Sequence, residues 1–170
     1  MRPWFRSLFA FFVLAGGTVG AQAYLAVSTG FPAVFGVHVG FTDLLGPDVD
    51  LRINLGGSAL AASGGLLFGA AAGADVLAYT ANDEVARSAP YGGAGAGVVV
   101  LGAAGDGSVG AAFAANVSGI VGVAFDLGGS EAFVELRGEL LVPPGSPVIF
   151  FPGARLGLVF PLSTRPGAGN

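Results

Sequence analysis

Bulky apolar residues occupy every second position in two neighbouring segments of the chain. Over 35–42 the odd positions are apolar, and the even positions hold glycine, histidine and threonine. Over 50–56 the odd positions are again apolar, while the even positions are polar or glycine. A period of two is typical of β-strands, because successive side chains point to opposite faces. With the breaker Gly46-Pro47-Asp48 between them, the two segments predict a β-hairpin.

The same alternation returns in the C-terminal half, over 116–126, 132–141 and 155–162. The turn sequence Gly128-Gly129-Ser130 separates the first two of these segments. One face of each segment is consistently apolar, and the opposite face is small, polar or charged. Across all the alternating segments, that opposite face collects seven charged residues: Asp50, Arg52, Asp126, Glu135, Arg137, Glu139 and Arg155.

Composition indicates which solvent the apolar face meets. The chain is 53% hydrophobic, contains 31 glycines and is only 11% charged, whereas an ordinary soluble domain is about 25% charged. Such a chain suits an apolar environment on its outside. An open sheet edge in lipid would expose unpaired backbone groups at several kcal/mol each, so the sheet must close. We therefore predict an all-β fold, a closed antiparallel up-and-down transmembrane β-barrel.

The number of strands follows from length. A membrane strand takes about 9–11 residues, so eight strands fit within residues 24–162, and ten remain possible. Alanine and glycine fill both faces of the two middle segments and hide their alternation. The predicted strands are Tyr24–Gly30, Val34–Leu44, Val49–Gly56, Leu66–Ala78, Tyr91–Leu101, Phe113–Asp126, Ala132–Leu141 and Ile149–Leu162.

Two uncharged segments, Ser58 to Ala74 and Gly107 to Phe125, leave a helical alternative open. Small residues at regular spacing can draw helices together in lipid, which would give a Gly-zipper membrane protein. Each glycine inside a helix costs about 1 kcal/mol relative to alanine. The alternation therefore favours strands.

The N-terminus has the organisation of a secretory signal peptide. Arg2 and Arg6 precede the apolar run Leu8 to Ala15, and small residues follow, with Ala21 and Ala23 forming an A-x-A cleavage pattern. The run is shorter than the roughly 20 apolar residues of a spanning helix. We expect residues 1–23 to be removed and the exported chain to begin at Tyr24. The alternative is an uncleaved anchor.

The charged face predicts what fills the barrel. An eight-stranded barrel has an interior just wide enough for side chains to fill, and an unpaired buried charge there costs several kcal/mol. We expect the seven charged residues to form a salt-bridged plug, with Arg137 or Arg155 near its centre. A proton or ion path is the functional alternative. A general porin is excluded, because porin-sized channels need about 16 strands.

Residues for catalysis or metal binding are scarce. His38 is the only histidine and there is no cysteine, so no metal site or cofactor is expected. Val39-Gly40 follows His38, which departs from the His-x-Ser pair of barrel deacylases, and no G-x-S-x-G motif is present. All seven basic residues are arginines and the net charge is −4, so no nucleic-acid partner is expected. A structural or surface-interaction role with a plugged lumen is favoured. The alternatives are a lipid-modifying enzyme of the outer membrane and the Gly-zipper helical membrane protein.

The final alternating segment is similar to the C-terminal β-signal of bacterial outer-membrane proteins. Arg155, Gly157, Phe160 and Leu162 match its polar, glycine and two apolar positions, and residues 163–170 follow as a tail. By this signal and by its strand pattern, the chain resembles the small eight-stranded barrels of the OmpA-transmembrane and OmpX type. The resemblance implies location in the outer membrane, contact with outer-membrane lipid, insertion by the barrel-assembly machinery and no cofactor. Under the surface-interaction hypothesis, the loops could bind an extracellular ligand.

Overall fold

The computed structural model describes residues 22–62, 65–80, 88–105 and 108–162, and these form eight β-strands. The predicted signal peptide up to residue 21 and the tail 163–170 lie outside the described residues. The strands are β1 (Gln22–Phe31), β2 (Phe35–Thr42), β3 (Val49–Ala62), β4 (Gly65–Tyr79), β5 (Ser88–Gly105), β6 (Ser108–Asp126), β7 (Glu131–Val142) and β8 (Ile149–Pro161).

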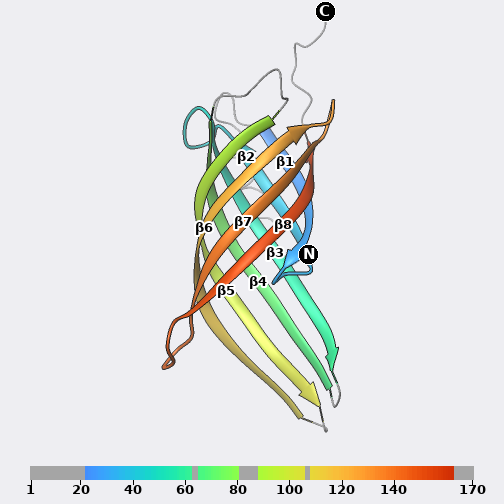
Figure 1. Ribbon diagram of the computed structural model, residues 1–170, viewed down its shortest axis with the longest axis vertical. Coiled ribbons are helices and arrows are strands. Elements are labelled where there is room, and N and C mark those ends of the chain that lie inside the picture. Colours follow the sequence, from blue (N-terminus) through green and yellow to red (C-terminus); the bar gives the residue numbers. More distant parts are fainter. Residues whose placement is uncertain (1–21, 63–64, 81–87, 106–107, 163–170) are drawn as a thin grey trace, which may run out of the picture.

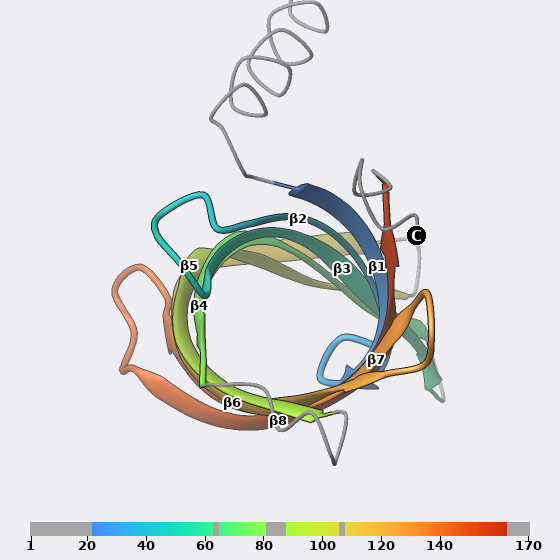
Figure 2. The ribbon, with the colours of Figure 1, turned by 90° about the horizontal axis from the view of Figure 1, so that it is seen from above.

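The eight strands form one closed barrel in which each strand pairs antiparallel with its neighbours in the sequence (Figures 1 and 2). Pairing of β8 with β1, for example Phe160 opposite Leu25, closes the ring. This confirms the predicted up-and-down barrel and its strand number. The two segments that left a helical alternative open lie mainly in β3, β4 and β6. No helix in the described part of the chain is long and apolar enough to cross a membrane.

The strands differ greatly in length. β1 and β2 have 10 and 8 residues, whereas β5 and β6 have 18 and 19. Toward the bottom of the barrel, the last residue pair between β2 and β3 is Phe35–Gly57, and the last pair between β6 and β7 is Ala115–Val142. Beyond these pairs β3 to β6 continue as two paired hairpins, at the bottom of Figure 1. We call this part, residues 58–62, 65–69, 99–105 and 108–114, the hairpin extension.

The predicted bounds of β3, β5 and β6 were wrong at the hairpin extension. β3 continues six residues past Gly56 to Ala62, and β6 begins at Ser108 rather than at Phe113. Alanine and glycine dominate these ends, so the alternation that marks a strand is too weak there to define its limit. Backbone pairing, which the sequence pattern does not report, extends these strands.

Outside and inside differ in residue size as well as in polarity. The outward side chains at mid-height are exposed and apolar, including Val121, Val134, Leu136 and Leu156. Inward, glycines leave room for aromatic rings. A Cβ at Gly40 would fall within the ring of Tyr24, and one at Gly157 would overlap the ring of Phe133. Tyr24 and Phe133 join Ala26 in a buried cluster that narrows the lumen.

The lumen is layered along the barrel axis. Toward the end that holds the β2–β3 and β6–β7 turns, it contains a second buried cluster of Leu77, Tyr91, Ile120 and Ala124. Buried charged residues occupy the middle. At the hairpin end, the β1–β2 turn folds inward (Figure 2). Glycines make room for this turn, since a Cβ at Gly56 would contact Ala33 and one at Gly153 would contact Pro32.

Candidate functional site in the barrel lumen

In the middle of the lumen, an arginine and an aspartate on two neighbouring strands form an ion pair. Arg52 on β3 is directly opposite Asp75 on β4 in the register. Nη2 of Arg52 lies 2.8 Å from Oδ2 of Asp75, and its Nε donates to the same oxygen at 3.2 Å. Nη1 of Arg52 also contacts Oε2 of Glu135, which comes from β7 on the other side of the barrel. One side chain therefore spans the lumen.

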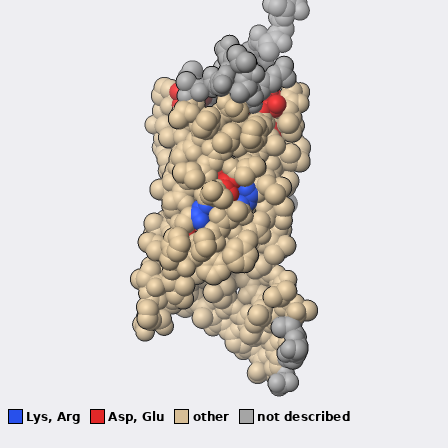
Figure 3. All heavy atoms as spheres, viewed as in Figure 1, with Lys and Arg blue, Asp and Glu red and all other residues tan. Residues whose placement is uncertain are grey.

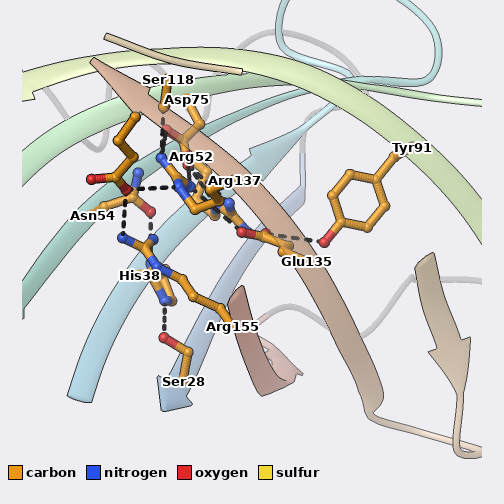
Figure 4. Close-up of polar contacts among 11 residues, drawn as sticks. Ser28, His38, Arg52, Asn54, Asp75, Tyr91, Ser118, Glu135, Arg137 and Arg155 are labelled. Carbon is orange, nitrogen blue, oxygen red and sulfur yellow. Dashed lines mark hydrogen bonds and ion pairs between the residues drawn. The ribbon is translucent and has the colours of Figure 1, made fainter. Parts of the chain in front are cut away.

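Arg137 on β7 makes the largest number of these contacts. Its Nη1 and Nη2 donate to the two carboxylate oxygens of Asp75 at 2.9 and 3.1 Å, a bidentate pair. Its Nη2 also donates to Oγ of Ser118 at 2.8 Å, and its Nε donates to Oε1 of Glu139 at 3.2 Å. Arg137 thus connects β4, β6 and β7, and it occupies the centre of the cluster (Figure 4).

Together the charged side chains form a neutral set of three guanidinium and three carboxylate groups. We call it the ionic network: Arg52, Asp75, Glu135, Arg137, Glu139 and Arg155. No member has a side chain more than 10% exposed. Removing charges from water is costly, and pairing with well-formed hydrogen bonds offsets that cost. Tyr91 adds a hydrogen bond from its hydroxyl to Oε2 of Glu135 at 3.0 Å.

Arg155 is the least satisfied member of the ionic network. Its one ion pair with a described residue joins its Nη2 to Oε1 of Glu139 at 3.8 Å, and Arg137 lies closer to that same oxygen. Nη1 of Arg155 is buried and has no hydrogen-bond partner among the described residues. Arg155 lines a cavity of about 30 Å³ together with Ala33, Asn54, Gly56 and Asn116.

A second polar chain runs beside the ionic network, on β1, β2 and β3. Nδ1 of His38 lies 2.6 Å from Oδ1 of Asn54, and its Nε2 lies 2.7 Å from Oγ of Ser28 (Figure 4). With Asn54 Oδ1 as acceptor, Nδ1 carries the proton and Nε2 accepts from the serine hydroxyl. His38 is buried, so both ring nitrogens are satisfied within the lumen. The order hydroxyl, imidazole, orienting group is that of a nucleophile with its base.

Two of the seven residues predicted for the plug do not join the ionic network. Asp50 is buried toward the turn end of the lumen, and of the arginines that the structure describes none forms an ion pair with it. Asp126 is exposed at the end of β6, where its Oδ1 accepts a hydrogen bond from the backbone N–H of Gly128 at 2.7 Å. The prediction that Asp126 belongs to the plug was wrong. Alternation continues to the last residue of a strand, but the barrel does not enclose the side chains at the strand ends. Of the two residues predicted near the centre of the plug, Arg137 occupies that position together with Arg52, whereas Arg155 lies at the edge.

The sequence pattern missed two contributors to the site, Asp75 and Tyr91. Asp75 pairs with both central arginines, yet it lies in β4, where small residues hide the two faces. A usable signal was present, because Asp75 is the only charged residue between Arg52 and Asp83. Tyr91 was hidden in the same way, by the glycine-rich start of β5. Ser118 lies on the polar face of the alternating segment 116–126, but alternation does not show that it contacts Arg137.

The residues of the predicted β-signal lie on both faces of β8. Arg155 and Gly157 face the lumen, while Phe160 and Leu162 are exposed on the outside. The backbone N–H of Leu162 donates to the carbonyl oxygen of Ala23 at 2.9 Å, continuing the seam between β8 and β1. Ala23 lies in β1 opposite Phe41, and Ala21 lies outside the described residues. The targeting roles of these residues stay predictions.

Comparison with known proteins supports the fold and leaves the family open. No protein-family model matches the sequence, and no curated protein matches it. Among solved structures, Neisserial surface protein A (NspA) superposes with a TM-score of 0.56 at 13% identity, covering 82% of this chain and 94% of that chain. The N-terminal β-barrel domain of Pseudomonas aeruginosa OprF gives a TM-score of 0.43 at 15% identity, covering 82% and 96%. At this identity, the likeness to NspA concerns the fold alone, that of an eight-stranded barrel.

Proposed function

We propose that this chain is a bacterial outer-membrane β-barrel with a plugged lumen and a structural or surface-interaction role, and that it is not a general porin. The ionic network is the observation that carries this proposal. It joins β3, β4, β6, β7 and β8 across the lumen with nearly complete burial of six charged groups. A lumen crossed by paired charges leaves no continuous water-filled path for solutes.

The apolar outer face supports location in a membrane. Mid-height outward residues such as Val117, Val121 and Leu136 are half or more exposed, which suits contact with acyl chains rather than water. A single-chain barrel with an exported N-terminus belongs in the outer membrane of a bacterium, where the barrel-assembly machinery would insert it. The hairpin extension projects past the closed ring. We place this projection at the cell surface, where it could meet an extracellular ligand.

Assembly of two variants tests this proposal. Phe160→Asp places a carboxylate on the lipid-facing side of the closing strand and removes an apolar β-signal residue, so we expect it to be lost from the outer-membrane fraction. Deletion of residues 163–170, the matched control, should leave assembly nearly unchanged. N-terminal sequencing of the assembled protein should begin at Tyr24. Recovery of Phe160→Asp at the wild-type level would contradict the β-signal, and a chain beginning at Met1 would contradict the cleaved signal peptide.

A lipid-modifying enzyme is a second candidate function, favoured by the hydrogen-bonded chain Ser28–His38–Asn54. Hydroxyl and imidazole lie at 2.7 Å and the orienting amide at 2.6 Å, within the range of a serine nucleophile and its base. Labelling of the folded protein with a fluorophosphonate, compared between wild type and Ser28→Ala, tests it directly. Labelling that is lost in Ser28→Ala would show that Ser28 is an activated nucleophile and would support this candidate. Absence of labelling would leave His38 as a buried hydrogen-bonding residue.

A further inference from the structure

The hairpin extension presents a second apolar surface, on the lumen side. In the register, inward positions of β3 to β6 beyond the ionic network are occupied by Leu60, Leu67, Val99, Leu101 and Ala112. Leu60, Leu67 and Leu101 are 64%, 49% and 51% exposed, although they point inward. They are uncovered because the short strands end before this level, so the extension is an open trough rather than a closed ring. We call this inward surface the apolar slot.

The ionic network forms the floor of the slot, and its least satisfied group lies there. The cavity that Arg155 lines includes Gly56 and Ala71, which are farther toward the hairpin tips than Arg52 and Asp75 on the same strands. Nη1 of Arg155 is buried without a hydrogen-bond partner among the described residues. A buried donor left unpaired costs about 1–3 kcal/mol, more when it is charged. A ligand oxygen in this cavity would remove that cost.

Size and charge narrow the chemistry of the ligand. A water-sized sphere needs about 10–15 Å³ of such space, so a cavity of about 30 Å³ accommodates about two to three groups of that size. The two oxygens of a carboxylate fit there, and they form charge-assisted hydrogen bonds with a guanidinium. Asp75 and Arg137 also line the cavity but are paired with each other, so Arg155 is the lining charge that lacks a close partner among the described residues. Between this floor and the hairpin tips, the described residues include no charged group. Figure 3 shows the charged atoms of the viewed face at mid-height and at the upper end, away from the hairpin extension.

We propose that the lumen binds a single-chain amphiphile with a carboxylate head, of the class of long-chain fatty acids. The carboxylate lies in the cavity and accepts a hydrogen bond from Nη1 of Arg155, with the amide side chains of Asn54 and Asn116 beside it. The hydrocarbon chain leaves past Ala33 of the β1–β2 turn and runs along the apolar slot, where it covers Leu67, Val99 and Leu101. The cavity at Arg155 therefore favours a ligand with an acidic headgroup, and the apolar slot favours one with a hydrocarbon chain.

Fluorescence quenching tests this site, because the sequence contains a single tryptophan, Trp4. In a Trp4→Phe background, Leu101→Trp places the fluorophore in the slot, and Val117→Trp places it on the outward face as the matched control. The probes are a bromine-labelled fatty acid and the corresponding bromine-labelled alcohol. We expect the acid to quench Leu101→Trp saturably at equimolar ratio. Quenching of Val117→Trp should rise without saturation as the probe partitions into the detergent micelle.

The headgroup is tested on the same protein. Arg155→Met should weaken saturable binding of the acid roughly 10- to 100-fold, as expected for loss of a hydrogen bond between charged groups, and Arg155→Lys should restore part of it. In the unaltered lumen, the alcohol should bind at least tenfold more weakly than the acid. Equal affinity for acid and alcohol would overturn the site even if the Arg155 variants failed to fold. Non-saturating quenching at Leu101 would equally overturn it, since the slot would then contact only bulk lipid or detergent.

Discussion

The two levels of the lumen use the same strands and place opposite chemistry on them. On β3, Arg52 lies in the ionic network and Leu60 in the apolar slot, eight residues or about 26 Å farther along the strand. On β4, Asp75 and Leu67 make the same contrast. At the first level all eight strands enclose the side chains, whereas at the second the wall is open. Enclosure explains the difference, because charges removed from water must pair with each other, while an open trough can be covered by lipid or ligand.

The largest effect should come from removing the central charge of the ionic network. Arg137→Ala leaves Asp75 with one arginine and strands Glu139 beside Arg155 at 3.8 Å. We expect a loss of about 3–5 kcal/mol in the free energy of unfolding, the usual range for breaking a buried ion pair. Urea unfolding in detergent measures it. Glu131→Gln, on an exposed side chain at the start of β7, is the control and should cost less than about 1 kcal/mol. Equal losses would mean that the network does not stabilise the barrel.

A smaller effect should follow from removing one neutral donor at the edge of the ionic network. Tyr91→Phe deletes the hydroxyl that donates to Glu135 at 3.0 Å and keeps the ring that packs on Tyr79. Glu135 retains both arginines, so we expect a loss of about 1–2 kcal/mol. Thermal unfolding followed by circular dichroism would show it as a lowered midpoint with an unchanged β-sheet spectrum. A loss as large as that of Arg137→Ala would indicate that Tyr91 fixes the geometry of the whole network.

The smallest effect should occur in the apolar slot. Leu101 is about half exposed, so Leu101→Ala removes little buried apolar surface and should cost about 1 kcal/mol or less in the absence of ligand. The same urea unfolding experiment measures it beside Arg137→Ala. A loss of several kcal/mol would mean that the slot is closed and packed, which would remove the distinction between the two levels.

Much of the fold could be predicted from sequence because alternation survives wherever outward residues are bulky. β7 is the clearest case, with Val134, Leu136 and Leu140 outward and Glu135, Arg137 and Glu139 inward. β8 and the start of β3 follow the same pattern. In the hairpin extension, by contrast, both faces are apolar or small, so the sequence there predicts neither the ends of the strands nor the direction of each side chain.

The candidate site could be predicted only in part, because its residues meet through pairing across strands. A charge on a clearly alternating strand, such as Arg52, was assigned to the lumen from its own segment. Asp75 was missed because its strand is mostly alanine and glycine. Which residue of β4 lies opposite Arg52 depends on the register between β3 and β4, which the sequence pattern does not give. Ser28, His38 and Asn54 show the same limit, since three strands bring them together and no spacing in the sequence relates them.

Conductance in a planar lipid bilayer most directly tests the claim that the ionic network plugs the barrel. The refolded protein should give no steady current, or only rare small openings, because Arg52 and Arg137 hold carboxylates from opposite walls at mid-lumen. Arg137→Ala should make such openings more frequent if the variant inserts. Stable, large conductance steps from the wild-type protein would contradict the plug and would require a wider or differently filled lumen.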